Sequence, residues 1–150
     1  MTLLDTNILL RLSEYGHVHY PLVRRAMRFP ESTREDVCYV PQTMVEFWAV
    51  RTRPLSANGQ GFVPREAAME AADIEAVIQI FPDNEEVHRV WRSLVAEYSV
   101  SGRQVHDARL VAATMVHGID QILTFNAKDF ARYRTIRVLD PRKIPDGMLA

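Results

Sequence analysis

Carboxylate side chains recur where apolar strands end and helices begin. The chain opens with an apolar stretch, residues 2–4, that runs directly into Asp5. In an open α/β sheet, side chains just beyond the carboxyl ends of parallel strands line the crevice in which ligands bind. A helix that begins near Asn7 could also use Asp5 or Thr6 as its cap, so this aspartate alone does not separate capping from chemistry.

A second aspartate is aligned with the apolar face of a predicted helix. Asp107 is followed at helical spacing by Leu110, Val111 and Thr114, so it shares the face that packs inward. The helix dipole favours an acid in the first turn, but it does not explain an acid on the buried stripe. Because a buried charge is costly unless it is paired, we expect Asp107 to have a functional role.

Two further segments carry acids or an amide in comparable places. Glu46 lies in a helix predicted over residues 41–51, at the margin of its apolar stripe, where it could reach a cleft or be an ordinary exposed glutamate. Asn126 and Asp129 follow a predicted strand and nearly match a capping box, which requires no catalysis.

Convergence of these side chains would create a cation site. Two carboxylates in close contact repel each other by about 4 kcal/mol at an effective dielectric of roughly 20, and a divalent cation relieves that repulsion. The sequence has no cluster of His or Cys at zinc spacing. Oxygen ligands alone favour Mg²⁺ or Mn²⁺.

Apolar strands that alternate with amphipathic helices would position these groups. This is the βαβ pattern of a parallel α/β sheet. We predict strands before Asp5 and at 37–40, 77–81, 121–125 and 136–139, and helices at 8–12, 22–29, 41–51, 66–77, 84–98, 106–117 and 127–133. In the helix at 41–51, the stripe formed by Met44, Phe47, Trp48 and Arg51 is predicted to turn its apolar members to the core. The turn-rich segment 53–64 is the one long loop, and could be a lid, a partner surface or a connector.

Composition indicates one globular domain. A chain of 150 residues that is 47% hydrophobic and 25% charged can build a single core. The net charge of −1 excludes a strong overall field for nucleic acid, so any basic surface must be local. Cys38 lies in an apolar stretch and is predicted to be a buried, inert thiol. With no charged leader and no membrane-length apolar run, we expect a cytoplasmic protein with no membrane partner.

Four stretches, taken in order, carry a family resemblance. They are Leu4-Asp5-Thr6-Asn7, Glu46 after a short strand, Gly102-Arg103-Gln104-Val105-His106-Asp107-Ala108, and Leu123-Thr124-Phe125-Asn126-Ala127-Lys128-Asp129-Phe130. They resemble the motifs of PIN-domain ribonucleases of the VapC toxin type, with matching order and spacing over essentially the whole chain. The resemblance implies one PIN-like nuclease domain, residues 1–150, with a three-layer α/β fold whose central parallel sheet is flanked by helices. It also implies a Mg²⁺- or Mn²⁺-dependent endoribonuclease, a homodimer, and neutralisation by a small cognate antitoxin.

The resemblance also assigns roles to single residues. Asp5, Glu46 and Asp107 match the acidic metal ligands, and Thr6, Asn7 and Thr124 match supporting polar positions. Many relatives have an aspartate where this chain has Asn126. Either Asn126 binds metal through its carbonyl oxygen or a water, or Asp129 supplies the missing charge, or both serve only structure.

Arginines near the acids are candidates for binding the RNA substrate. Arg103 and Arg109 flank Asp107 in the sequence, and Arg51 ends the helix that carries Glu46. Arginine suits phosphate, although ordinary solvated surface explains these positions equally well.

Two other classes of protein stay open. A HAD-like phosphohydrolase would also begin with a strand and an aspartate, but it would carry a second aspartate two residues later, where this chain has Asn7. A non-catalytic PIN-like module that binds RNA or protein would keep the fold and lose the acids, which Asp5, Glu46 and Asp107 argue against.

Overall fold

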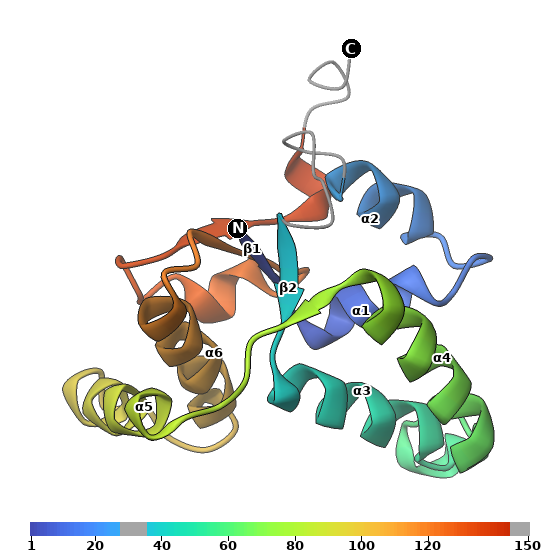
Figure 1. Ribbon diagram of the computed structural model, residues 1–150, viewed down its shortest axis with the longest axis horizontal. Coiled ribbons are helices and arrows are strands. Elements are labelled where there is room, and N and C mark those ends of the chain that lie inside the picture. Colours follow the sequence, from blue (N-terminus) through green and yellow to red (C-terminus); the bar gives the residue numbers. More distant parts are fainter. Residues whose placement is uncertain (28–35, 145–150) are drawn as a thin grey trace.

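Five short parallel strands form one sheet, and helices cover both of its faces (Figure 1). The computed structural model describes residues 1–27 and 36–144. The strands are β1 (Thr2–Leu4), β2 (Val37–Tyr39), β3 (Gln79–Ile80), β4 (Gln121–Leu123) and β5 (Arg137–Leu139), in the spatial order β3-β2-β1-β4-β5. The first strand of the chain is therefore the central one, and the predicted α/β fold with a parallel sheet between helical layers is confirmed.

Strand β1 is apolar throughout because it is buried on both faces. Successive strand residues point to opposite faces. Leu3 accordingly packs in the core beneath α5 (Glu85–Glu97) and α6 (Gln104–His117), whereas Leu4 packs in the core on the other side of the sheet.

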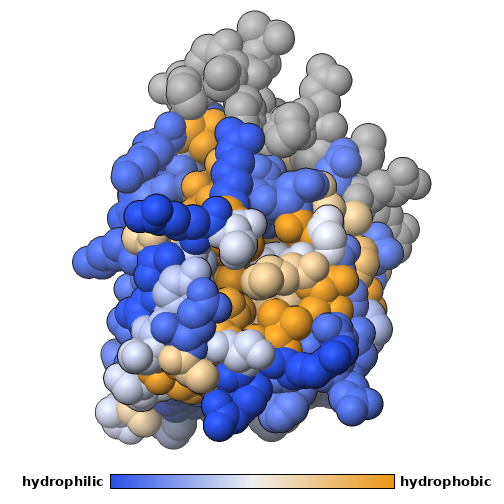
Figure 2. Space-filling view, turned by 90° about the vertical axis from the view of Figure 1, so that its left-hand side faces the viewer, coloured by the Kyte–Doolittle hydropathy of each residue, from blue (hydrophilic) through white to orange (hydrophobic). Residues whose placement is uncertain are grey.

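The second core lies beneath four helices. They are α1 (Thr6–Leu12), α2 (Tyr20–Ala26), α3 (Pro41–Thr52) and α4 (Pro64–Val77), and three short 3₁₀ helices complete the description: η1 (Leu55–Ala57), η2 (Ala127–Phe130) and η3 (Pro141–Lys143). Figure 2 shows the left-hand side of Figure 1, where α5 and α6 lie, and apolar surface there is bordered by hydrophilic side chains. Within residues 1–27 and 36–144, no helix combines the length and apolar character that crossing a membrane requires.

Most predicted elements are present, with shifted ends. The strand predicted at 77–81 is reduced to the two residues of β3, and the helix predicted at 127–133 is the short η2. The helix predicted at 22–29 begins earlier, as α2, and its last two predicted residues lie outside the described part of the chain. Cys38 is buried as predicted, and burial raises the pKa of its thiol to about 12.

Helix α3 corrects one prediction about packing. Phe47 is fully buried as expected, but Trp48 is 37% exposed and does not belong to the core. The guanidinium of Arg51 takes a buried position on the same helix. The predicted stripe therefore buries its polar member, Arg51, and leaves Trp48 partly exposed.

The segment 53–64 folds back onto the end of α3. The backbone N–H of Gln60 donates to the carbonyl of Val50, and that of Phe62 donates to the carbonyl of Arg51. Gly59 is required for this return, because a Cβ there would lie 2.0 Å from the carbonyl oxygen of Arg53. The loop is therefore tied to the helix that it follows.

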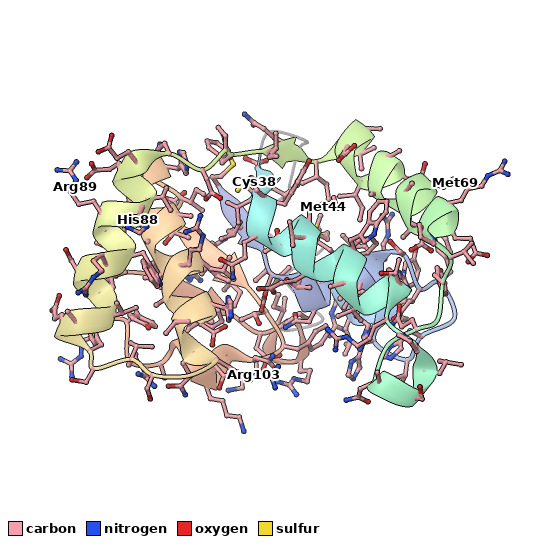
Figure 3. All side chains as sticks on the ribbon, turned by 90° about the horizontal axis from the view of Figure 1, so that it is seen from below. Cys38, Met44, Met69, His88, Arg89 and Arg103 are labelled. Atoms are coloured by element: carbon pink, nitrogen blue, oxygen red, sulfur yellow. The ribbon has the colours of Figure 1, made fainter. Side chains whose placement is uncertain are left out.

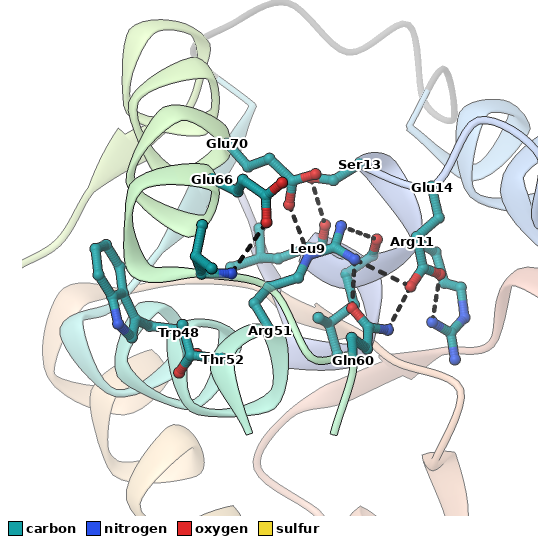
Figure 4. A network of polar contacts seen from close by, with 12 residues as sticks. Leu9, Arg11, Ser13, Glu14, Trp48, Arg51, Thr52, Gln60, Glu66 and Glu70 are labelled. Carbon is teal, nitrogen blue, oxygen red and sulfur yellow. Dashed lines mark hydrogen bonds and ion pairs between the residues drawn. The ribbon is translucent and has the colours of Figure 1, made fainter. Parts of the chain in front are cut away.

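Arg51 is the centre of a buried polar network that joins several elements (Figure 4). Its Nε lies 2.6 Å from Glu70 Oε2 on α4, and its Nη1 donates to Glu14 Oε1, 3.3 Å away and beyond the end of α1. Nη1 also donates to the side-chain oxygen of Gln60. The guanidinium carbon lies 4.9 Å from the ring centroid of Phe62. One side chain, 2% exposed, thus connects α1, α3, the returning loop and α4.

We predict that Arg51→Ala lowers the free energy of unfolding by about 3 kcal/mol, because it leaves the carboxylate of Glu70 without its cation and Glu14 with Arg11 alone. Urea denaturation measures the change. Arg53→Ala is the matched control, since Arg53 is exposed two residues away and its loss should change the free energy by less than about 0.5 kcal/mol. Equal effects of the two substitutions would show that the network does not stabilise the fold.

Candidate active site

Asp5 uses one carboxylate oxygen to cap α1 and the other to contact Asn7 and Thr124. Its Oδ1 accepts a hydrogen bond of 2.7 Å from the backbone N–H of Thr6, so it caps α1. Its Oδ2 accepts bonds from Thr124 Oγ1 at 2.6 Å and from Asn7 Nδ2 at 3.0 Å. Burial raises the pKa of Asp5, and the nearby charge of Glu46 adds to the rise, although the three hydrogen bonds oppose it. The cap thus holds a carboxylate at the end of the central strand, where burial and a neighbouring acid disfavour its charge.

Glu46 reaches this site from α3. The hydroxyl of Thr6 donates to Glu46 Oε2 at 2.7 Å, and Gln42 Nε2 donates to Oε1 at 2.9 Å. The same Gln42 amide donates to the backbone carbonyl of His106 at the start of α6. Glu46 is therefore fixed at the margin of its helix beside Asp5. The role of Gln42 was not predicted, although its position one turn before Glu46 is a signal for such a bond.

Asp107 is half-buried and faces the other acids. Burial raises its pKa to about 6, and the charges of Asp5, Asp129 and Glu46 contribute in that order. Leu110, its neighbour on the same helix face, is buried, as the helical spacing predicted. Within residues 1–27 and 36–144, Asp107 accepts no hydrogen bond and forms no ion pair, and the charge of His106 opposes the rise of its pKa by less than the three acids add.

Thr124 connects the end of β4 to the end of β1. Besides donating to Asp5, its buried hydroxyl oxygen accepts from Asn7 Nδ2 at 3.2 Å and from the backbone N–H of Asn126 at 3.0 Å. The other side of the Asn7 amide accepts from the N–H of Phe125 at 3.1 Å. The three predicted supporting residues, Thr6, Asn7 and Thr124, thus all contact the acids directly or fix their orientation.

The capping box predicted at Asn126 and Asp129 is not formed. The Asn126 side chain makes no cap bond and is exposed, and its backbone N–H is bonded to Thr124 and not to Asp129. Asp129 is half-buried and close enough to Asp107 to raise its pKa. Of the two candidates for the fourth position, the structure brings Asp129 to the other acids.

The predicted substrate-binding arginines lie in three different environments. The prediction for Arg51 is wrong, because its guanidinium is buried in the network described above. Arg109 is paired with Asp83, 2.8 Å away, which the sequence did not indicate. Arg103 is exposed at the N-terminal end of α6 (Figure 3) and stays a prediction.

The donor atoms suit a hard divalent cation by type. The four acids, Asp5, Glu46, Asp107 and Asp129, offer only oxygen ligands. Their negative charges repel one another, and a divalent cation would neutralise them. No Lys or Arg of the described residues pairs with any of the four. In that same part of the chain, no three Asp, Glu, His or Cys side chains are arranged to hold one ion. The fit therefore lies in the chemistry of the ligands, and the side chains would have to draw together around the cation.

Comparison with known proteins supports this picture of the fold. The family model described as PIN domain matches residues 2–136. A toxin–antitoxin complex from Klebsiella pneumoniae is similar in structure, with 20% identity and a TM-score of 0.65 over 96% of this chain and 100% of that chain. FitAcB from Neisseria gonorrhoeae has 20% identity and a TM-score of 0.69 over 96% and 100%. VapC20 of Mycobacterium tuberculosis, described as a sarcin-ricin loop cleaving toxin, has 18% identity and a TM-score of 0.65 over 89% and 95%. No curated protein matches the chain.

We predict that the charge of Asp107 destabilises the folded protein above pH 6. Its pKa of about 6 lies above the ordinary 3.8, so the folded state binds the proton more tightly than the unfolded state between these values. Without metal, Asp107→Asn should therefore raise the free energy of unfolding above pH 6 by about 1 kcal/mol, allowing for screening of a half-buried group.

This advantage of Asp107→Asn should disappear below about pH 4, where Asp107 is protonated in both states. Urea denaturation in EDTA between pH 4 and pH 8 measures the difference. Asp73→Asn, at an exposed position on α4, is the control. A difference between wild type and Asp107→Asn that does not vary with pH would contradict the raised pKa.

Proposed function

This chain belongs to the PIN domain family, and we propose that it is a divalent-metal-dependent endoribonuclease that acts as the toxin of a toxin–antitoxin pair. One observation carries the proposal. Four carboxylates, Asp5, Glu46, Asp107 and Asp129, come from four separate segments, and three of them raise the pKa of the fourth, Asp107. Repulsion among carboxylates at the carboxyl ends of the central strands is typical of a site that binds a cation and a phosphodiester.

Asp5, Glu46 and Asp107 are the residues that would hold Mg²⁺ or Mn²⁺, with Asp129 as the fourth acid. When bound, such a cation supplies Lewis acidity toward phosphodiester oxygens and toward the attacking water. Asp129 replaces Asn126 in this proposal because Asp129 faces Asp107, whereas the Asn126 side chain is exposed.

The protein's own groups would orient the reaction. Asp107 or Glu46 would orient the attacking water. Thr6 holds Glu46 beside Asp5, while Thr124 and Asn7 fix the Asp5 carboxylate. No histidine pair is needed for the hydrolysis, because water and not the ribose 2′-hydroxyl is the nucleophile.

The toxin assignment draws on the structural relatives. A complex from Klebsiella pneumoniae is described as toxin–antitoxin, and VapC20 as a toxin that cleaves the sarcin-ricin loop. By analogy, the partners of this chain would be an RNA substrate, a second copy in a homodimer, and a small antitoxin in the cytoplasm. An antitoxin arginine could form a charge-assisted pair with one of the clustered carboxylates and exclude substrate.

The HAD-like alternative loses support at Asn7. A second aspartate is expected at that position, but Asn7 donates through its amide to Asp5 and accepts from Phe125. It is an organiser of the first carboxylate and has no charge of its own.

We predict that Asp5→Asn and Asp107→Asn each lower the rate of RNA cleavage by about 10²-fold or more, because each removes charge that organises the transition state. Mg²⁺ or Mn²⁺ should raise the melting temperature of wild type, by the equivalent of about 2.7 kcal/mol at 100 times the Kd. Asp107→Asn should lose most of that rise. Asp129→Asn should also impair cleavage, whereas Asn126→Ala should cleave like wild type.

The control for the metal effect is Asp73→Asn, which changes an exposed carboxylate outside the cluster. Cleavage and melting temperature are measured on the same preparations. If Asp107→Asn and Asp73→Asn respond alike to metal and cleave RNA alike, the cluster is not the active site. A large loss in Asn126→Ala together with an active Asp129→Asn would instead assign the fourth position to Asn126.

We also predict that expression of the wild-type chain alone arrests bacterial growth, whereas Asp5→Asn does not, because the toxicity depends on cleavage. A small protein encoded next to this chain should restore growth and bind both forms. Growth curves and immunoblots of the soluble fraction provide the measurement. Harmless wild type at the same soluble level as Asp5→Asn would reject the toxin role and leave the nuclease activity to the cleavage assay.

A further inference from the structure

We propose that a stack of side chains beside the acidic cluster binds an unpaired base of the RNA, which rests on the proposed ribonuclease function. The stack consists of His17, His19, Phe125 and Arg142, and we call it the stacking column. It draws on three segments: the turn before α2, the residue after Thr124, and η3. These segments lie far apart in the sequence and meet only in the fold.

The rings of the stacking column are in close contact. The imidazole of His19 lies 4.7 Å from the phenyl ring of Phe125, with an angle of 21° between the planes. His17 is next, with its ring centroid 5.2 Å from that of His19. The guanidinium carbon of Arg142 lies 5.7 Å from the Phe125 ring. The His19 and Phe125 rings thus stack on each other, the Arg142 guanidinium lies over the Phe125 ring, and the His17 ring meets that of His19 at an angle of 57°.

The column is placed directly beside the candidate active site. Phe125 follows Thr124, whose hydroxyl bonds to the Asp5 carboxylate, and consecutive Cα atoms are about 3.8 Å apart. The N–H of Phe125 is held by the side chain of Asn7, which also contacts Asp5. A nucleotide whose phosphate lies at the carboxylates therefore has its neighbouring base within reach of the column.

The polar atoms of the column are largely unused. His19 is the N-cap residue of α2, but its side chain makes no cap bond, and within the described residues it forms ring contacts and no hydrogen bond. His17 uses Nδ1 to accept from the backbone N–H of His19 and keeps Nε2. A site that served packing alone would not need ring nitrogens with spare hydrogen-bonding capacity. Tyr15 in the same turn adds further aromatic surface, 78% exposed.

Arg142 gives the column a fixed guanidinium plane at one end, with its charge paired to Asp140. Its Nε and Nη2 donate to the two oxygens of Asp140 at 2.9 and 2.7 Å, and Nη2 also donates to the carbonyl of Phe125 at 2.6 Å. The guanidinium plane is thereby held while the side chain stays about half exposed. His, Phe and Arg planes are the surfaces on which proteins stack unpaired RNA bases. An apolar peptide would gain less from this surface, because the column lacks aliphatic side chains and ends in a guanidinium.

The test uses Asp107→Asn as the parent protein and is run without divalent metal, so that RNA cleavage is slow on the timescale of the binding measurement. The probe is a short single-stranded RNA with 2-aminopurine at its centre, whose fluorescence falls when the base stacks. His19→Ala in this parent should weaken binding, measured by anisotropy, by about 5-fold or more, the factor that corresponds to 1 kcal/mol of stacking. It should also abolish the fall in fluorescence. His19→Phe should retain both.

The matched control is His88→Ala. His88 (Figure 3) lies on α5 and also contacts an aromatic ring, that of Trp91 at 5.5 Å, but it lies outside the column. Its substitution should leave RNA binding unchanged. An RNA with an abasic site at the probe position should bind the parent and His19→Ala equally. Melting temperatures of all variants confirm that each protein is folded.

The outcomes distinguish failure of the stacking column from failure of the proposed ribonuclease function. If the parent binds RNA and wild type cleaves it, but His19→Ala binds the probe as tightly as His88→Ala does, the stacking column is wrong and the proposed function stands. Unchanged RNA affinity with weaker binding of a protein partner would likewise overturn the column as an RNA site. If the parent binds no RNA and wild type cleaves none, both the function and this inference are rejected.

Discussion

The repulsion among four carboxylates is the constraint on which the site depends. Asp5 can stay buried beside Glu46 only because Thr6, Asn7 and Thr124 donate hydrogen bonds to it. Those donors come from the start of α1 and the end of β4, and both follow strands at the centre of the sheet. The parallel arrangement of β1 and β4 is therefore what allows a cluster of like charges to exist at this edge.

Helix α3 serves the site with one face and the fold with another. Glu46 and Arg51 are five residues apart, so they point in directions that differ by about 140° around the helix axis. Glu46 faces Asp5 through Thr6, whereas Arg51 is buried between two acids and two aromatic rings. Burial raises the pKa of Glu70 even though Arg51 opposes the rise, and the charges of Glu14 and Asp73 add to it. Anchoring one face of the helix fixes the orientation of the carboxylate on the other.

Local patterns predicted the sheet, the helices and the alignment of Asp107 with a buried stripe, because strand and helix periodicity are properties of short segments. They could not place Asp129, since its approach to Asp107 depends on how η2 packs beside α6, and a capping box looks the same in sequence whether or not it forms. The roles of Arg51 and Arg109 were missed for the same reason. Their acids, Glu70 and Asp83, lie on segments whose approach only the fold determines.

The four carboxylates differ in how freely they can rearrange. A carboxylate offers about four lone pairs, and hydrogen bonds occupy one on Asp5 Oδ1 and two on Oδ2, which leaves one on Oδ1. Glu46 is held at both oxygens, by Thr6 and by Gln42. The side chains of Asp107 and Asp129 accept no hydrogen bond in the described residues, so these two can turn at least cost. Since no three of these groups are arranged to hold one cation, binding it would require movement chiefly of Asp107 and Asp129, the two carboxylates that no hydrogen bond fixes.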